Sequence, residues 1–458
     1  MSSPRRSIHG QWSSRLAFVL AATGSAVGLG NIWKFPYITG EYGGGAFVLV
    51  YLLCIAVIGV PIMMAEVLLG RRGRQSPMNT MRDLAHEAGH NAIWRWIGWM
   101  GVLAGFLILS YYSVVAGVAL GYTVRAGLGS FEAVSSAGAH ALFKDFIGDP
   151  ERLLAWHTLF MVMTMVVVSR GVRSGLERAV TFLMPGLFII LVLLIGYAMA
   201  QGQFMEGLRF MFKPDFSKLS SEAVLVAMGH AFFTLSLGMG AIMMYGSYLS
   251  SKTSITRVCI TVAGLDTLVA LMAGLAIFPI VFANGMDPGA GFGLVFLSLP
   301  IAFGQMPMGT LFATLFFLLL VFAAWSSAIS LIEPAVAWLV ENHGMGRGRA
   351  SVLVGAIAWA LGLVTVLSFN HWAFTFRFAG QVKETGMFDV LDILTSSIML
   401  PLGGLFIAIF AGWIMTRKSV REELRLKDGP GFKLWYVLVR FVAPIGILVV
   451  FLNLIGLI

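Results

Sequence analysis

The chain has 458 residues, of which 58% are hydrophobic and only 12% are charged, a composition that excludes a soluble domain. The formal net charge of +9 does not indicate a nucleic-acid partner, because the basic residues lie in short loops between apolar segments, where they set membrane topology. Cys54 and Cys259 lie in apolar segments without a spacing partner, so neither a disulfide framework nor a thiolate metal site is expected.

Apolar runs of about 20 residues recur along the whole chain, as a hydrocarbon core roughly 30 Å thick requires of each spanning helix. They predict one transmembrane domain over residues 1–458. The first run follows arginines but has no cleavage-like end, so it is expected to be a span and not a removed signal. About eleven spans are predicted, near 12–38, 44–70, 94–125, 154–170, 177–200, 222–249, 254–283, 307–341, 350–368, 388–415 and 433–457.

Basic clusters fall on one side of these spans, which by the positive-inside rule predicts a cytoplasmic N-terminus and a C-terminus outside the cell. The expected location is the inner (plasma) membrane. Long outer connections near 201–221 and 284–306 could cap a vestibule. The clusters are Arg5, Arg6 and Arg15; Arg71, Arg72 and Arg74; Arg170, Arg173 and Arg178; Arg347 and Arg349; and Arg417, Lys418, Arg421, Arg425 and Lys427.

The first predicted span contains GSAVGLGNIWKFPY, which runs from Gly24 to Tyr37 and has three glycines in seven residues. Backbone groups freed by a helix break cannot face lipid, so such a stretch survives only where protein, water or a ligand satisfies them. Gly24 and Gly28 also have the spacing of tight helix packing. Because Asn31 and Lys34 follow directly, packing alone is an insufficient account, and we expect a transporter-type binding site.

The sixth predicted span contains a second break, with Ser236, Gly238 and Gly240 in mid-helix. Five spans separate the two breaks, and an odd number of spans per half inverts the second half relative to the first. We therefore predict a 5+5 inverted repeat, with repeat one at about 12–200, repeat two at about 222–415 and an extra helix at about 433–457.

These motifs resemble a known family. GSAVGLGNIWKFPY, followed by EYGGGAFVLVY and Glu66, is closely similar to the neurotransmitter:sodium symporters, as are Tyr111 and Tyr112, FFTLSLGMG in the sixth span and AAWSSAISLIEP in the eighth. The resemblance covers nearly the whole chain. It implies the LeuT-type fold and sodium-driven uptake of an amino acid or amine, and eleven spans fit many bacterial members.

The resemblance also implies two sodium sites, and a hard cation such as sodium prefers the oxygen ligands that an unwound backbone supplies. The first site would use the carbonyls of Ala26 and Thr234, the side chains of Asn31, Thr234 and Asp266, and the substrate carboxylate. The second would use the carbonyls of Gly24, Val27 and Ala323 with the hydroxyls of Ser326 and Ser327.

The implied amino-acid site places the substrate carboxylate at the Leu29 and Gly30 amides and the Tyr112 hydroxyl, where a half-helix dipole favours an anion. The amine would face carbonyls of Ala26, Phe233 and Thr234 and the side chain of Ser236, with Ser327 nearby. The side-chain pocket carries no charge, which favours a neutral hydrophobic or aromatic amino acid, and a flexible methionine in it favours broad selectivity. Its residues are Ile108, Val115, Phe233, Met239, Ile329 and Leu331.

Asp266 departs from the family pattern, in which many members have Asn there and chloride-dependent members have Ser at the position of Ala270. A unit charge about 4 Å from sodium is worth roughly 4 kcal/mol at an effective dielectric near 20, above the roughly 2.5 to 3.5 kcal/mol insertion cost of the acid. We therefore expect chloride-independent transport. The alternative is an Asp satisfied by neighbouring hydroxyls.

Gate residues follow from the same resemblance, with Lys34 and Asp392 matching the external charged pair and Trp12, Tyr248 and Glu341 the cytoplasmic gate. His9 stands where the family has an arginine, so Arg5, Arg6 or Arg15 could substitute, or His9 could make inner closure sensitive to pH. His230 is expected to be a hydrogen-bonded core histidine and not a proton carrier.

Two other functions fit the sequence less well. His86, Glu87 and His90 match the H-E-x-x-H pattern of zinc proteases, but Gly89 weakens a helix there and no third ligand follows at a recognised spacing. An ion channel would need a filter motif or an acidic ring, and neither is found in the sequence.

Overall fold

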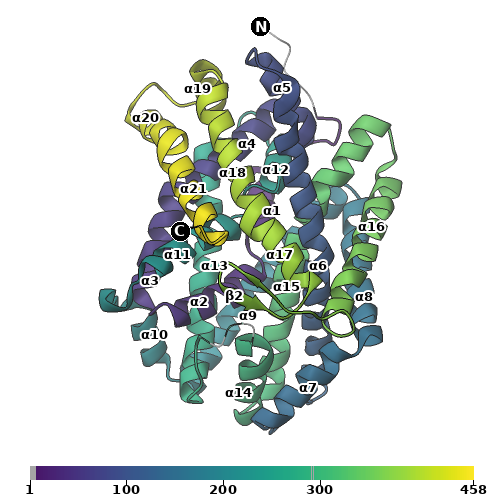
Figure 1. The fold of residues 1–458 in the computed structure, drawn as a ribbon, viewed down its shortest axis with the longest axis vertical. Coiled ribbons are helices and arrows are strands. Elements are labelled where there is room, and N and C mark those ends of the chain that lie inside the picture. Colours follow the sequence, from purple (N-terminus) through teal and green to yellow (C-terminus); the bar gives the residue numbers. More distant parts are fainter. Residues whose placement is uncertain (1–6, 290, 292, 458) are drawn as a thin grey trace.

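The computed structural model describes residues 7–289, 291 and 293–457, and its architecture is helical throughout, apart from one short hairpin (Figure 1). The apolar runs become helices because a helix satisfies its own backbone polar groups, which hydrocarbon cannot do. Capping residues fix where several of these helices begin, since the hydroxyls of Ser14, Ser220 and Ser254 each accept a first-turn N–H of a spanning helix. The predicted all-α polytopic membrane fold is confirmed.

The predicted spans are found in order. In the described part of the chain, nine continuous helical segments are long and apolar enough to cross a membrane, and α1 with α2, which meet at a 56° bend, make a tenth. Helices α11 and α12 occupy the sixth predicted span as two pieces separated at residues 235–240. Counting this second interrupted span gives the predicted total of about eleven.

The first five spans begin with the interrupted one, where a π-helical turn, Gly30–Lys34, connects the break to α2. Their helices are α1 (Arg15–Ala26) with α2 (Phe35–Glu41), α3 (Gly45–Cys54) with α4 (Val60–Gly73), α6 (Arg95–Gly127), α8 (Pro150–Ser169) and α9 (Arg178–Gln201).

The remaining six spans follow the same plan and again begin with an interrupted one. Their helices are α11 (Ser221–Thr234) with α12 (Ala241–Ser247), α13 (Ile255–Ala283), α15 (Gly309–His343), α16 (Arg347–Ser368), α17 (Met387–Asp392) with α18 (Leu400–Ile409), and α20 (Pro430–Val437) with α21 (Ala443–Leu454).

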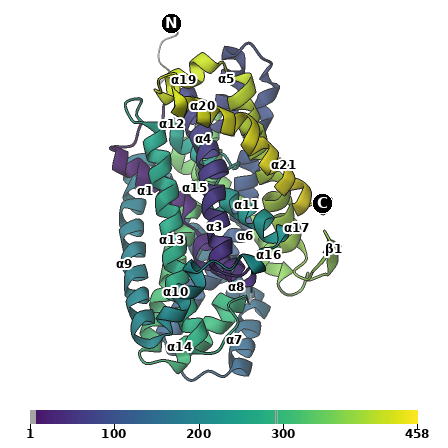
Figure 2. The same cartoon turned by 90° about the vertical axis from the view of Figure 1, so that its left-hand side faces the viewer.

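Long helices surround the two breaks. In the centre α6 packs along α15, and α1 packs against both α13 and α15. Figure 2 shows α9 and α13 side by side along one edge, and α8 and α16 pack together at another edge in Figure 1. Helix α21 lies outside this core against α18 and α11. The interrupted backbone is therefore shielded from lipid by protein.

Several of the basic clusters lie at one end of the molecule. The described chain begins at one end, with α5 (Pro77–Glu87) and α19 (Arg417–Leu424), as Figure 1 shows. Three of the basic clusters meet other segments there: Arg71 donates to Glu423, Arg173 donates to the carbonyl of Gln11 3.0 Å away, and Arg347 donates to the carbonyl of Val168 at 3.0 Å. Basic residues thus gather at the N-terminal end. Arg5 and Arg6 lie outside the described residues.

The opposite end carries short helices that the sequence did not predict. They are α7 (Ser136–Gly148) and α14 (Leu299–Gln305), at the bottom of Figure 1, and α10 (Phe204–Phe212), at its lower left. The strands β1 (Phe376–Phe378) and β2 (Gln381–Lys383) form an antiparallel hairpin in which Phe376 pairs with Lys383 and Phe378 with Gln381.

Candidate functional site

The break in the first span exposes backbone groups that side chains of other spans meet. Helix α1 ends at Ala26 because Val27 is extended (φ −68°, ψ 107°). The N–H of Gly28 donates to Asn31 Oδ1 at 3.0 Å, and the N–H of Leu29 donates to the hydroxyl of Tyr112 at 3.3 Å. The break is thus held open by one side chain from its own segment and one from α6.

The break in the sixth span contains three residues with positive φ, namely Ser236 (55°), Gly238 (81°) and Gly240 (74°). Two of these positions are glycine, which adopts this conformation without a Cβ penalty. The Ser236 hydroxyl donates to the carbonyl of Ser25 at 2.7 Å, and the N–H of Gly238 donates to Glu66 Oε1 at 2.6 Å. The two breaks therefore touch each other directly, through Ser236 and Ser25.

A first group of oxygen atoms lies beside the breaks. Asn31 Nδ2 donates to Asp266 Oδ1 at 2.8 Å and to its carbonyl at 3.2 Å, and the Thr234 hydroxyl lies 3.1 and 3.3 Å from the two carboxylate oxygens. All three side chains are buried. The structure thus brings together the three side chains predicted for the first sodium site; Asp266 and Thr234 meet through oxygen atoms, and Asn31 meets Asp266 through its amide nitrogen.

A second group of oxygen atoms lies where α15 crosses the first break. The Ser327 hydroxyl is 3.4 Å from the carbonyl of Gly24 and 3.1 Å from that of Val27. The neighbouring Ser326 hydroxyl bonds to carbonyls of its own helix, including Ala323 at 3.1 Å. Gly24 permits the crossing, since a Cβ there would lie 3.2 Å from Ser326 Cβ. The residues predicted for the second sodium site are neighbours.

A cavity of about 570 Å³ opens between the two breaks. Its lining is mostly apolar, and its charged residues are Lys34, Asp392, Asp389 and Lys383 of the hairpin. It includes twelve of the thirteen predicted substrate residues, Ala26, Leu29, Gly30, Ile108, Tyr112, Val115, Phe233, Thr234, Ser236, Met239, Ser327 and Leu331.

Ile329 is the exception, because it is buried in the core and does not line the cavity. At 100° per residue, a position two residues after Ser327 points to the far side of α15, whereas Leu331, four residues on, returns to the same face. Placing Ile329 in the pocket was therefore wrong in this structure.

Comparisons with known proteins agree with this geometry. The model of the sodium:neurotransmitter symporter family matches residues 9–131 and 145–457. The chain belongs to this family. It is 38% identical to the uncharacterized sodium-dependent transporter YhdH of Bacillus subtilis (strain 168), over 97% of this chain and 98% of that one. It is 34% identical to an uncharacterized sodium-dependent transporter of Haemophilus influenzae, over 96% and 97% of the two chains.

The crystal structure of MhsT in complex with L-phenylalanine has the same fold as this symporter family member, with a TM-score of 0.88 and 44% sequence identity over 97% of this chain and 99% of that chain. The predicted LeuT-type fold is therefore confirmed. The protein is a secondary transporter and not an enzyme.

The predicted outer gate of this transporter is separated. Lys34 and Asp392 both line the cavity, but no ion pair within 4.0 Å joins them in the described part of the chain. The Lys34 ammonium lies 5.0 Å from the ring centre of Phe233, while Asp392 Oδ1 accepts the hydroxyls of Tyr111 at 3.3 Å and Ser396 at 2.8 Å. The cavity continues past this pair to Lys383 and Asp389.

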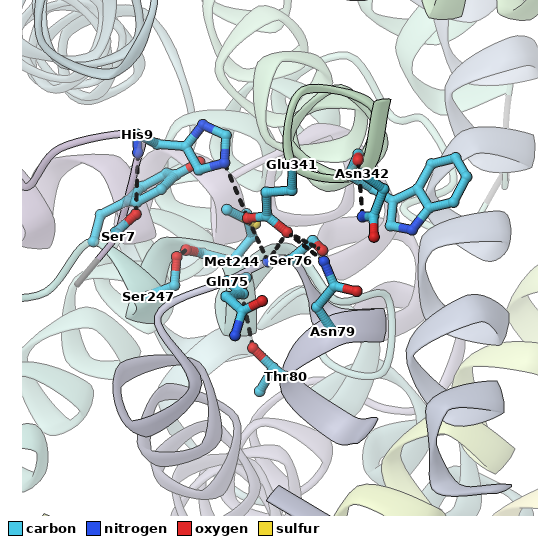
Figure 3. A network of polar contacts seen from close by, with 12 residues as sticks. Ser7, His9, Gln75, Ser76, Asn79, Thr80, Met244, Ser247, Glu341 and Asn342 are labelled. Carbon is cyan, nitrogen blue, oxygen red and sulfur yellow. Dashed lines mark hydrogen bonds and ion pairs between the residues drawn. The ribbon is translucent and has the colours of Figure 1, made fainter. Parts of the chain in front are cut away.

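The predicted inner gate is closed. The Trp12 indole donates to the carbonyl of Tyr245 at 3.1 Å, and its backbone N–H donates to the carbonyl of Tyr248 at 3.2 Å. Glu341 meets His9 at 3.0 Å, so the histidine contacts the acid from the position at which the family has an arginine (Figure 3). Arg15 is exposed at the start of α1 and does not replace it.

One inner contact was missed by the sequence interpretation. Tyr248 does not bond to Glu341, because its hydroxyl donates to Glu333 Oε1 at 2.6 Å, and Glu333 pairs with Arg347. Glu333 belongs to the motif AAWSSAISLIEP, and Arg347 to a cluster already noted for topology. The sequence did contain one indication of this contact: Glu333 is an acid inside a spanning helix, and such a residue needs a partner.

His230 is buried as predicted, but the predicted hydrogen bond is absent. In the part of the chain that the structure describes, neither ring nitrogen has a hydrogen-bond partner. The ring packs between aromatic side chains, with its centre 6.0 Å from that of Phe35 and 5.5 Å from that of Tyr51. Apolar packing on α11 takes the place of hydrogen bonding.

The zinc-protease pattern lacks its helical context. Helix α5 ends at Glu87, and Gly89 has φ +77°, so His86 and His90 do not share one helical face. Glu87 bonds to Arg72. Among the described residues there is no group of three or more His, Cys, Asp or Glu side chains placed to hold a metal ion.

The expected vestibule is built only in part from the two predicted segments. The residues near 284–306 contribute Gly291 to the cavity wall, but none of 201–221 lines it, because α10 packs against α13 and α3. Phe143 and Ile147 of α7 and Lys383 of the hairpin take that place. These contacts join segments far apart in sequence, so no local pattern announces them.

Proposed function

We propose that this transporter carries a neutral hydrophobic or aromatic amino acid together with sodium, by alternating access and without a need for chloride. The observation that carries the proposal is the meeting of two helix breaks, through Ser236 and Ser25, beside a buried Asp266 and a largely apolar cavity. Freed backbone groups, a fixed anion and an uncharged wall suit a zwitterion and cations bound together.

The zwitterion fits the polar groups of the cavity. Its carboxylate would accept the hydroxyl proton of Tyr112, which itself accepts the N–H of Leu29, and would also meet the amide of Gly30. Its amine would face the carbonyls of Ala26 and Phe233 and the side chain of Ser236. These partners are few and directional, as in most small-molecule sites.

The substrate side chain would lie against Ile108, Val115, Phe233, Met239 and Leu331, which all line the cavity. A charged side chain in this wall would leave a buried group unpaired, at a cost of several kcal/mol. MhsT, with 44% identity, is seen with L-phenylalanine, which supports an aromatic or aliphatic substrate here.

Two sodium ions fit the two groups of oxygen atoms. Asp266, Asn31 and Thr234, with the carbonyl of Ala26, would hold the first ion, and the hydrogen bonds now among these side chains would reorganise around it. Ser327, Ser326 and the carbonyls of Gly24, Val27 and Ala323 would hold the second. Oxygen donors from backbone, hydroxyl, amide and carboxylate groups are the ligands that a hard cation takes.

Chloride independence follows from the charge of Asp266. Ala270 lies one helical turn further along α13 and is fully buried, and its methyl side chain has no hydroxyl to offer an anion. A fixed carboxylate beside the first sodium ion would balance the charge that chloride balances in other members of the family.

The orientation is part of the same proposal. The basic N-terminal end would face the cytoplasm. The closed inner gate and the separated Lys34 and Asp392 then describe a state open to the outside.

Uptake into proteoliposomes tests the proposal. Screening the twenty amino acids should select neutral hydrophobic or aromatic ones, with uptake lost when choline replaces sodium and unchanged when gluconate replaces chloride. Uptake that persists in choline would refute sodium coupling. Uptake that vanishes in gluconate would refute only the chloride part, and saturation of the rate with substrate would separate a carrier from a pore.

A further inference from the structure

The inner gate contains a histidine and a carboxylate buried against each other. His9 Nε2 lies 3.0 Å from Glu341 Oε1, and the two side chains are only 3% and 6% exposed. A second hydrogen bond helps to position His9, since its backbone N–H donates to the hydroxyl of Ser7 at 3.3 Å. Figure 3 shows the imidazole reaching from the N-terminal segment to the end of α15.

Glu341 is anchored independently of His9. Its carboxylate accepts the backbone N–H of Ser76 at 2.8 Å, the Ser76 hydroxyl at 2.5 Å and the amide of Asn79 at 2.9 Å (Figure 3). Ser76 is the residue before the first turn of α5, so the carboxylate lies at a helix N-terminus, where backbone donors and the helix dipole favour an anion. The acid therefore stays in place whether or not His9 binds it.

The strength of the contact depends on the charge of His9. A neutral imidazole can donate one hydrogen bond from Nε2, whereas an imidazolium adds a full positive charge, and a charge-assisted bond is roughly twice as strong. Histidine is the side chain whose charge ordinarily changes between pH 5 and 8, whereas arginine keeps its charge at any physiological pH.

We propose that His9 is a positioning residue of the transport cycle, whose protonation fastens the N-terminal segment to Glu341 and keeps the inner gate shut. Loss of that proton leaves only a neutral hydrogen bond and lets the segment leave more often. The inference rests on the proposed alternating-access function for its role in transport, but the gate contact itself does not.

In the described part of the chain, the other charged groups that we find near His9 have partners of their own. Tyr248, whose ring centre is 5.9 Å from that of His9, donates to Glu333, and Glu333 pairs with Arg347. Arg74, at the end of α4, donates to the carbonyls of Ser247 and Leu249.

On the chain that follows His9, Arg173 donates to the carbonyl of Gln11, and the backbone N–H of Ser13 donates to Glu177 at 3.1 Å. Glu341 is thus the carboxylate that directly faces the imidazole. Because its negative charge attracts a positively charged imidazolium, the contact is strongest at acid pH and weakens as pH rises.

The consequence for transport is a release step that responds to cytoplasmic pH. When the inner gate must open to discharge sodium and substrate, an acid interior would favour the shut state and a neutral or alkaline interior the open one. The coupling is a difference in the affinity of one proton for two conformations.

A cysteine reporter behind the gate tests this directly. Ser247 is buried beside the gate (Figure 3), so Ser247→Cys in a Cys54→Ala, Cys259→Ala background reports inner opening by its labelling with an impermeant maleimide. Labelling of the purified full chain is measured from pH 5.5 to 8 and divided by that of the denatured protein at each pH, because thiolate content also rises with pH. The normalised rate should increase about fivefold, the difference expected between a charged and a neutral hydrogen bond.

Matched variants assign the effect to His9. His9→Arg should keep labelling low at every pH, and His9→Gln, which can donate without charge, should keep it high at every pH. His140→Gln, at an exposed histidine of α7, should retain the pH response.

The result that would overturn the proposal is a pH response that survives in His9→Arg. Even if His9→Gln fails to fold, the arginine variant keeps the test decisive. The assay needs neither sodium nor substrate, so failure of the proposed function, seen as absent sodium-dependent uptake at all pH values, is distinguishable from failure of this inference.

Discussion

At the scale of single residues, Asp266 has the greatest influence on the proposed chemistry. It is a fully buried acid in a spanning helix, and among the described residues its side-chain partners are an amide, Asn31, and a hydroxyl, Thr234, both uncharged. Intramembrane acids are costly and usually mark an ion or proton path. Neutral partners satisfy its hydrogen bonds but leave the charge to be balanced by a bound cation.

Asp266→Asn should therefore weaken sodium binding while leaving the fold intact, because the amide preserves the shape and most hydrogen bonds. Removing a unit charge near the ion should raise the sodium concentration for half-maximal uptake by at least about tenfold. The measurement is uptake against sodium concentration, with Asp215→Asn, an exposed acid, as the control. An unchanged sodium dependence would remove Asp266 from the first site.

At the scale of elements, the two interrupted spans depend on close approach at glycine. A Cβ at Gly28 would lie 2.8 Å from the Ser327 hydroxyl and 3.1 Å from that of Tyr112. Both hydroxyls belong to the proposed sodium and substrate sites, so this glycine sets the space in which those sites form.

Gly28→Ala should displace both hydroxyls and lower the apparent affinity for sodium or substrate about tenfold, since overpacking of this kind costs roughly 1 to 3 kcal/mol. The matched control is Gly264→Ala, because Gly264 lies in α13 with open space around the position of its missing Cβ. Equal uptake by the two variants would show that the crossing at Gly28 is not needed for binding.

The breaks themselves could be predicted from the sequence, because glycines and polar residues inside an apolar run have no other use at that depth. Contacts between distant segments could not. Ile329 was assigned to the pocket by matching a sequence motif, although the period of the helix turns this position away from the cavity. The hydrogen bond from Tyr248 to Glu333 depends on how α12 faces α15. The hairpin that brings Lys383 to the cavity wall could not be predicted from the local sequence, since its strands have only three residues each.

At the scale of the whole molecule, charge asymmetry sets the orientation that we propose. Alkaline phosphatase fused after Leu457 should be active in a bacterial host, since the C-terminus is expected outside, and a fusion in the basic connection after Thr253 should be inactive. A GFP fusion at each site should give the inverse pattern. Activity at both sites, or only after Thr253, would contradict the assignment.

The central claim, that two interrupted helices form one pocket filled jointly by sodium and an amino acid, is tested most directly by equilibrium binding to the purified protein. Radiolabelled L-phenylalanine, the amino acid bound by MhsT, is the first probe, followed by the other neutral hydrophobic amino acids. The account predicts saturable binding in sodium that weakens by at least about tenfold in choline at equal ionic strength. Equal binding in the two salts, or no binding of any such amino acid in sodium, would contradict it.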